Sequence, residues 1–232
     1  MNEFIMVLAI LILIGYGVLF LEKAQYNTIP RIIWTYWEEP DHLDSKKRLS
    51  DRAKEAIRSW EQYNPDYKII LLTKKTYQGY VTIPEEIRAH PALNPDYLCD
   101  LIKLWVLAER GGIWIDPEIK MKKPLDPWLF TTYGELAAVM DHEKTSDPSH
   151  PVIDPRFVAC NKGSQAIRKW RDEFSEIIQF HSVDQYIDHR NHIDHQKIHD
   201  PIKDVIQIAQ LISLKNYPKE PIIIHRINLS AQ

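Results

Sequence analysis

The chain has 232 residues, of which 44% are hydrophobic and 26% are charged. This length allows one compact domain with an additional segment, and the composition excludes a disordered or repetitive protein. The 29 basic and 32 acidic residues give a net charge of −3, without the basic excess that binding a nucleic acid backbone requires. The 2 cysteines, Cys99 and Cys160, have neither the number for a disulfide framework nor zinc-site spacing. We therefore expect no nucleic-acid partner.

A run of 18 uncharged residues, from Phe4 to Leu21, opens the chain. A membrane-spanning helix needs about 17 to 25 such residues, so the run predicts one N-terminal transmembrane helix, with residues 1–22 as a membrane anchor. The alternatives are a cleaved signal peptide and a buried core helix; no basic residue precedes the run, and it is apolar on all sides. Lys23 favours a cytosolic catalytic domain, whereas a glycosylation sequon at residues 228–230 suits the other side, so the orientation stays open.

The part after the predicted anchor opens with a β-α-β pattern. Residues 29–37 are rich in β-branched and aromatic side chains, as is typical of a strand. Residues 41–60 have apolar positions at steps of three and four, which predicts a helix, and residues 67–72 are a second apolar strand. A β-α-β unit builds a mostly parallel sheet.

A second helix and strand follow with clear end signals. Asn94 is a possible N-cap, and Gly111 and Gly112 stop a helix predicted over residues 95–110. Residues 113–115 then form a short strand, which the Asp-Pro pair after it must end.

Further strands are predicted at residues 136–140 and 156–160, followed by an amphipathic helix over residues 166–178. Strands that alternate with helices indicate an α/β fold with a mostly parallel central sheet flanked by helices. We assign residues 23–232 to this single domain.

Two acids, Asp116 and Glu118, follow the strand predicted at residues 113–115. On an extended segment, side chains two positions apart point the same way, so both carboxylates can bind one cation from one side. Oxygen ligands suit Mg²⁺ or Mn²⁺, which keep positions open for the phosphate oxygens of a diphosphate leaving group. The alternative is an ordinary pair of surface acids, although ligands of open α/β sheets do bind at the carboxyl ends of strands.

Asp100 and Lys103 are three residues apart on the predicted helix and therefore share one face. A carboxylate there can accept hydrogen bonds from sugar hydroxyls, and a lysine can contact a phosphate or sugar oxygen. The alternative is an exposed ion pair worth a few tenths of a kcal/mol.

Three runs between residues 29 and 129 carry a resemblance: IPRIIWTYW, SWEQYNPDYKIILL and YLCDLIKLWVLAERGGIWIDPEIKMKKPLDPWL. Together they resemble the capsular polysaccharide synthesis branch of the DXD-containing glycosyltransferases, which is related to the fungal initiating mannosyltransferases of glycosyltransferase family 32. The resemblance implies a Rossmann-like GT-A fold and a Mn²⁺ or Mg²⁺ cofactor. It also implies hexosyl transfer from a nucleotide-sugar donor to a glycan or polysaccharide acceptor, with retention of the anomeric configuration.

By position, the resemblance makes Asp100 the contact to the donor sugar and places Trp114 along the nucleotide. Asp116 and Glu118 occupy the D-x-D positions, which bind the metal and the ribose. Trp34 resembles the aromatic residue that stacks on the base, and the alternative is a core tryptophan.

The chain differs from the family pattern at three positions. Cys99 stands where the family has serine, Lys103 where it has arginine, and Glu118 where it has the second aspartate. Lys103 is still expected to bind the donor, as a point charge instead of a bidentate fork. Many GT-A enzymes complete the metal shell with a histidine near the carboxyl end, which here makes His225 a third metal ligand; the alternative is a strand histidine without that role.

Other polar groups fit several functions. Five histidines lie close together in the sequence, His181, His189, His192, His195 and His199. Charged residues lie between these histidines, so a solvated face is a more ordinary interpretation than a zinc site. Acids at or near strand ends are Asp141, Glu143 and Asp154, beside His142. No catalytic nucleophile is assigned, and two other functions remain open: a metal-dependent phosphoesterase, for which no second acidic motif is evident, and a catalytically inactive nucleotide-sugar-binding module.

Overall fold

The computed structural model describes residues 29–38, 49–91, 93–129, 135–147, 150–180, 205–214 and 222–225. The predicted anchor at residues 1–22, the histidines between residues 181 and 199 and the sequon at residues 228–230 lie outside this part. Within the described ranges, no helix combines the length and the apolar character that crossing a membrane requires.

The predicted β-α-β opening is confirmed. Strand β1 (Ile32–Tyr36) pairs in parallel with β2 (Lys68–Leu72), and helix α2 (Asp51–Tyr63) connects them. Helix α2 starts at Asp51 because the Ser50 hydroxyl accepts a hydrogen bond of 3.1 Å from the Ala53 amide, which satisfies a free donor of the first turn.

The second predicted helix and strand are confirmed as well. Helix α4 (Pro95–Arg110) begins after Asn94, whose side chain accepts a hydrogen bond of 2.8 Å from the Tyr97 amide. Gly111 then ends the helix at a φ of 66°, and β3 (Gly112–Ile115) begins at once and pairs in parallel with β1.

The remaining described elements are η1 (Tyr77–Gly79), α3 (Glu85–Arg88), α5 (Asp126–Leu129), β4 (Leu136–Met140), β5 (Ile153–Cys160), α6 (Gln165–Ile177), α9 (Val205–Leu214) and β6 (Ile222–His225). The strand predicted at residues 136–140 therefore has the expected bounds. The strand predicted at residues 156–160 begins three residues earlier, and the helix predicted at residues 166–178 is α6.

The described strands form one mixed sheet in the order β2-β1-β3-β5-β4-β6. Strand β5 is antiparallel to both of its neighbours, whereas the other pairs are parallel. The expectation of a mostly parallel sheet therefore needs a correction at β5. The connection between β4 and β5 returns the chain directly to the adjacent strand, and a direct return makes a pair antiparallel.

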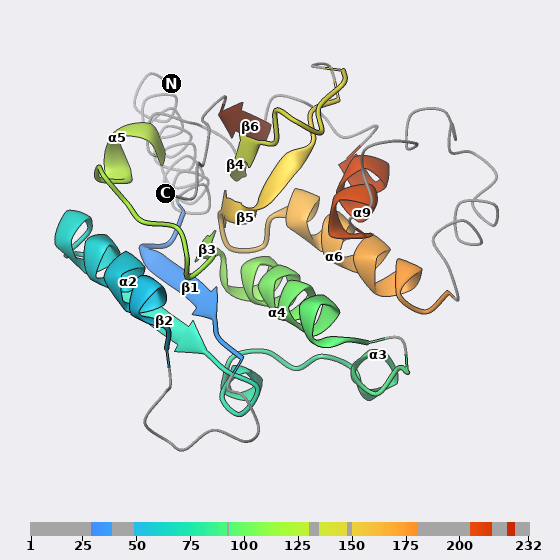
Figure 1. Ribbon diagram of the computed structural model, residues 1–232. Helices are drawn as coiled ribbons and strands as arrows, with labels where there is room; N and C mark the ends of the chain where they lie inside the picture. Colours follow the sequence, from blue (N-terminus) through green and yellow to red (C-terminus); the bar gives the residue numbers. More distant parts are fainter. Residues whose placement is uncertain are drawn as a thin grey trace, which may run out of the picture.

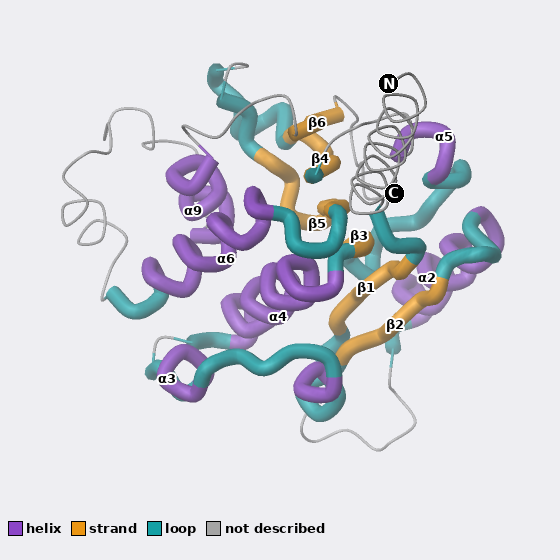
Figure 2. The backbone as a smooth tube through the Cα atoms, turned by 180° about the vertical axis from the view of Figure 1, so that it is seen from behind, coloured by secondary structure: helices purple, strands orange, loops and turns teal. Residues whose placement is uncertain are grey.

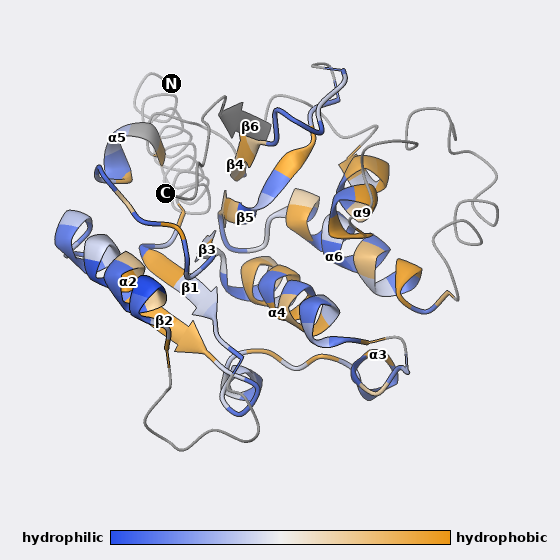
Figure 3. Ribbon diagram, in the orientation of Figure 1, coloured by the Kyte–Doolittle hydropathy of each residue, from blue (hydrophilic) through white to orange (hydrophobic). Residues whose placement is uncertain are grey.

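Helices cover both faces of the sheet, as Figures 1 and 2 show from opposite sides. Helices α4, α6 and α9 lie on one face, where Trp34 and Trp114 are buried in the larger core cluster. Helices α2 and α5 lie on the other face, against Ile33 and Ile113. Figure 3 shows hydrophobic residues along β1, β2 and α9, which this packing buries. This mixed sheet with helices on both faces fits a GT-A-like α/β fold.

Candidate active site

Several polar side chains meet at one edge of the sheet, where β1, β3 and β4 end and β5 begins. The Asp116 amide, just after β3, donates a hydrogen bond of 2.9 Å to the Arg156 carbonyl on β5. This edge is where open α/β sheets bind their ligands. The predicted site residues Asp100, Lys103, Trp114 and Asp116 all lie at this edge.

Asp100 and Lys103 share a face of α4, as predicted, but they are not an exposed pair. The Lys103 Nζ donates a hydrogen bond of 2.8 Å to Asp100 Oδ1, and the side chains of Lys103 and Asp100 are 4% and 17% exposed, respectively. The ammonium group also lies 5.4 Å from the centre of the Trp114 ring, within the range of a cation–π contact. The alternative of a solvated surface ion pair is therefore wrong.

The charges of this cluster depend on one another. Burial by itself lowers the pKa of Lys103, but the carboxylates of Asp100 and Asp116 outweigh it and raise this pKa above its usual value. Burial raises the pKa of Asp116, against the opposing effects of Lys103 and of the Trp114 indole, which donates a hydrogen bond of 3.0 Å to Asp116 Oδ1. The charged form of Lys103 is thus favoured by the ion pair with Asp100 and by the nearby charge of Asp116.

Asp116 and Glu118 are arranged differently from the prediction. Strand β3 ends at Ile115, and the Ile119 amide donates a hydrogen bond of 3.0 Å to the Asp116 carbonyl, which closes a turn. The two acids therefore do not lie on an extended segment, and the argument that their side chains align by strand alternation was wrong. Glu118 is exposed in this turn, and its carboxylate lies 4.0 Å from the Arg52 guanidinium.

The described residues of this site can hold a metal ion only together with ligands from a substrate. The described part of the chain has no group of three histidine, cysteine or acidic side chains that could enclose a metal ion. Mg²⁺ is, however, commonly bound by one or two carboxylates together with substrate phosphates, and Asp116 and Glu118 offer such a set. His225 ends β6, opposite Val139 of β4, so β5 and β4 separate it from β3 by roughly 14 Å of backbone. Its side chain is not among those that the structure describes, and its role as a ligand stays a prediction.

Two tryptophans have structural roles instead of the expected contacts to a nucleotide. Trp34 is 2% exposed, its Nε1 donates a hydrogen bond of 2.8 Å to the Gly111 carbonyl, and its ring packs edge-on against Tyr80. Trp34 is therefore the core residue of the alternative interpretation, and its face is not accessible to a base. Trp114 is 0% exposed, so it does not line a nucleotide pocket. Its indole nitrogen binds Asp116, and its ring contacts the Lys103 ammonium group, so it orients both side chains.

Sequence reasoning missed Tyr36 and Trp37 at the carboxyl end of β1. The Tyr36 hydroxyl and the Trp37 indole nitrogen are buried, and neither has a hydrogen-bond partner among the described residues. Burial, followed by the charge of Glu38, raises the pKa of Tyr36, so its hydroxyl stays a donor. Unpaired buried donors are costly, and a bound ligand at this edge can supply their acceptors. The second tryptophan of the W-x-x-W pattern was the available signal.

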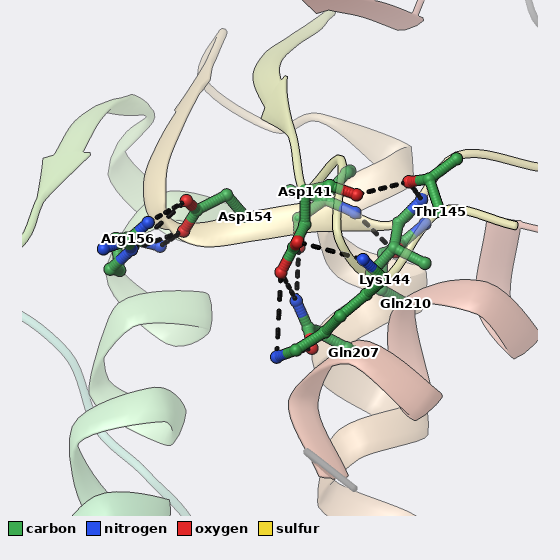
Figure 4. Close-up of polar contacts among 9 residues, drawn as sticks. Asp141, Lys144, Thr145, Asp154, Arg156, Gln207 and Gln210 are labelled. Atoms are coloured by element: carbon green, nitrogen blue, oxygen red, sulfur yellow. Dashed lines mark hydrogen bonds and ion pairs between the residues drawn. The ribbon is translucent and has the colours of Figure 1, made fainter. Parts of the chain in front are cut away.

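A second group of polar side chains lies where β4 ends and β5 begins, as Figure 4 shows. Asp154 binds the Arg156 guanidinium through several contacts, the shortest 2.6 Å. Asp141 accepts a hydrogen bond of 3.2 Å from Gln207 of α9 and lies 3.7 Å from the Lys144 Nζ. His142 and Glu143, in the turn after Asp141, are exposed. Of these groups the acids and His142 had been noticed in the sequence, whereas Arg156 had not, because an arginine on a strand carries no motif.

Comparison with known proteins gives the chain a family context. A family model described as "Capsular polysaccharide synthesis protein" matches residues 18–207. The "Initiation-specific alpha-1,6-mannosyltransferase" of Candida albicans is 28% identical over 106 residues, which are 43% of this chain and 27% of that protein. The protein of the same name from Saccharomyces cerevisiae is 24% identical over 169 residues, 66% of this chain and 35% of that protein. The chain thus spans about a third of the length of these relatives.

Among solved structures, the "PaToxG Glycosyltransferase" superposes with a TM-score of 0.49 at 14% sequence identity. The superposition covers 90% of this chain and 77% of that structure.

Proposed function

Because the chain belongs to the capsular polysaccharide synthesis protein family, we propose that it is a glycosyltransferase. It transfers a hexosyl group from a nucleotide-sugar donor to a hydroxyl group of a glycan or polysaccharide, with retention of configuration at the anomeric carbon. The observation that carries the proposal is the cluster of the buried Lys103 with the partly buried Asp100 and Asp116, at the carboxyl ends of the strands. Mannosyltransferases are among the relatives, which supports sugar transfer as the reaction class.

In this proposal the chain holds the donor with Asp100. The side chain of Asp100 keeps 17% of its surface accessible, so its carboxylate can accept a hydrogen bond from a sugar hydroxyl while it also binds Lys103. Lys103 is 4% exposed by side chain and acts on the donor through Asp100 and not by direct contact. The Trp114 indole keeps the Asp116 carboxylate oriented toward the site. Such fixed polar groups lower the barrier because they need no reorganisation during the reaction.

Asp116 and Glu118 are the proposed holders of Mn²⁺ or Mg²⁺. The cation supplies positive charge to the departing nucleoside diphosphate. Exposure of Glu118 and its long distance to Arg52 support this assignment, because the carboxylate is accessible and only weakly paired. The membrane belongs to the same proposal: residues 1–22 anchor the enzyme and keep it beside a membrane-associated acceptor.

The decisive experiment measures hydrolysis and transfer with a panel of UDP- and GDP-sugars in the presence of Mn²⁺ and in the presence of EDTA. We expect one donor class to turn over only with the metal. Asp100→Asn should lower kcat/KM for that donor by roughly a hundredfold in protein that circular dichroism shows to be folded, because the lost contact strengthens in the transition state. Its melting temperature should also fall, because the buried Lys103 loses its carboxylate partner.

The matched control is Asp66→Asn, which neutralises an exposed acid just before β2 and should leave turnover unchanged. This acid lies where β2 begins, at the end of the strands away from the candidate site. Full activity of Asp100→Asn would show that this residue does not bind the donor. Binding of nucleoside diphosphates without turnover of any donor would instead indicate an inactive binding module, and release of phosphate from phosphate esters would indicate a phosphoesterase.

A further inference from the structure

We propose that Arg156 is a donor-binding residue whose guanidinium contacts the diphosphate of the nucleotide sugar. The inference rests on the proposed function and adds a residue that neither the sequence motif nor the family match assigns.

The need for another cation follows from the burial of Lys103. Its side chain is 4% exposed, and its ammonium group is held between Asp100 and the Trp114 ring. With 4% of its side chain exposed, Lys103 offers a diphosphate almost no accessible surface, and a closer approach would disturb its buried ion pair, which is costly. The lysine at the motif position therefore leaves the diphosphate without a direct partner from α4.

Arg156 lies next to the acidic motif. Trp114 of β3 pairs with Val158 of β5, and the next link between the strands is the hydrogen bond from the Asp116 amide to the Arg156 carbonyl, 2.9 Å long. Side chains two apart on a strand share a face, so Arg156 lies on the face of Val158, which is packed in the same core cluster as Trp114. Arg156 and Asp116 therefore occupy the same face at the same edge.

The guanidinium is both fixed and accessible. Its Nε and a terminal nitrogen donate to the Asp154 carboxylate at 2.9 and 2.6 Å, the two-pronged geometry that arginine forms with a carboxylate. Asp154 is 7% exposed by side chain, whereas 43% of the Arg156 side chain is exposed. In Figure 4 the Arg156 side chain lies on the side of Asp154 that is away from Asp141 and Gln207. A buried carboxylate thus holds an accessible cation in one orientation, so little conformational entropy is lost when an anion binds.

The surrounding charges keep Arg156 protonated. The hydrogen bonds that Arg156 donates to Asp154 raise its pKa most. Burial lowers this pKa, and the charges of Asp154, Asp116 and Asp141 raise it further. This dependence also indicates that the guanidinium lies within electrostatic reach of Asp116, where the diphosphate is expected.

Two other cations near this edge are less suitable. Lys144 donates a hydrogen bond of 2.6 Å to the buried Gln207 and lies beside Asp141, on the side of Asp154 away from Arg156 in Figure 4. Arg52, in the first turn of α2, lies 4.0 Å from Glu118, so its charge faces a carboxylate that the proposal assigns to the metal ion. Arg156 combines accessibility with a position on the same face as Asp100 and Asp116.

The test measures binding of UDP, UMP, GDP and GMP to the full chain by isothermal titration calorimetry, in EDTA and again with Mn²⁺. Arg156→Gln should weaken binding of the preferred diphosphate by about tenfold or more in EDTA, because a charge-assisted contact to phosphate is lost. The affinity for the monophosphate should fall much less, so the preference for diphosphate over monophosphate should decrease. Arg156→Lys keeps the charge without the fork and should bind with intermediate affinity.

The matched control is Arg110→Gln, which removes the same charge from the other end of α4, ten residues or roughly 15 Å along the helix from Asp100. The Arg110 guanidinium donates hydrogen bonds of 3.1 and 2.9 Å to the Tyr80 carbonyl, far from the acidic cluster. The affinity of this variant for diphosphates should therefore equal that of the wild type.

Wild-type diphosphate affinity in a folded Arg156→Gln variant, or in Arg156→Lys if the first does not fold, would overturn the assignment of Arg156. An equal loss for monophosphate and diphosphate would do so too, since it would point to a general structural effect. If the wild-type chain binds neither UDP nor GDP under either condition, the proposed function itself fails, and this outcome is distinct from a failure of Arg156 alone.

Discussion

At the scale of single residues, Lys103 is the most consequential side chain of the site. It stands where the family pattern that the sequence resembles has an arginine, and the structure gives a reason for a smaller head group. The ammonium group has one carboxylate oxygen of Asp100 at 2.8 Å on one side and the Trp114 ring on the other. A point charge satisfies this arrangement, whereas a guanidinium would need further acceptors in the same small space.

We therefore predict different consequences for two substitutions of Lys103. Lys103→Met removes the charge at nearly constant volume and leaves two acids without their cation, which should lower the free energy of unfolding by about 3 kcal/mol. Lys103→Arg keeps the charge, and its main cost is overpacking, about 1 to 3 kcal/mol. Urea unfolding monitored by tryptophan fluorescence measures both values. Equal stability of Lys103→Met and the wild type would mean that the pair is not buried in solution.

At the scale of elements, the link between α4 and β3 sets the geometry of the site. Gly111 and Gly112 have φ angles of 66° and 100°, which lets the helix end and the strand begin without an intervening loop. A Cβ atom on Gly112 would lie 2.8 Å from Trp34 Nε1 and 2.7 Å from the Ile32 carbonyl oxygen. The absence of a side chain thus allows β3 to lie directly against β1 and brings Asp116 close to Asp100.

Gly112→Ala should therefore destabilise the protein by about 2 kcal/mol or more, since it adds both backbone strain and a steric clash. Gly79→Ala is the control, because a Cβ atom there would have no heavy atom within 4 Å. That variant should be as stable as the wild type or more stable by about 0.5 kcal/mol. Thermal unfolding of the two variants side by side measures the difference, and similar melting temperatures would show that the tight junction is not required.

At the scale of the whole molecule, the reversed direction of β5 brings additional chemistry to the site. Because β5 runs against β3 and β4, its first residues, and not its last, lie at the edge where Asp116 and Asp141 lie. Asp154 and Arg156 reach the site in this way. Within the described part of the chain, both core clusters consist of residues from Ile29 onward.

From this packing we predict that a chain without residues 1–22 is soluble, folded and able to hydrolyse the nucleotide-sugar donor. The full chain should sediment with membranes and resist extraction by alkaline carbonate, whereas the shortened chain should remain in the supernatant, because it lacks the apolar run of 18 residues. Circular dichroism and the donor assay check its folding and activity. Aggregation or loss of donor binding in the shortened chain would mean that residues 1–22 belong to the catalytic domain.

The amino-acid sequence by itself determined the local features of this protein. The caps and stops of α4, the β-α-β opening and the shared helical face of Asp100 and Lys103 were predictable because they depend on residues within a few positions of one another. The family also followed from the sequence, since its motifs lie in one continuous region.

Only the tertiary structure decided which of these residues are buried and which are accessible at the candidate site. Trp34 and Lys103 are buried because distant segments pack over them, and no local pattern distinguishes a core tryptophan from one that stacks on a base. The turn after β3 and the direction of β5 likewise depend on long-range contacts, such as the hydrogen bond from Asp116 to Arg156. Burial and strand direction arise from pairings between residues far apart in the chain, and for that reason the arginine at the site became apparent only in the folded molecule.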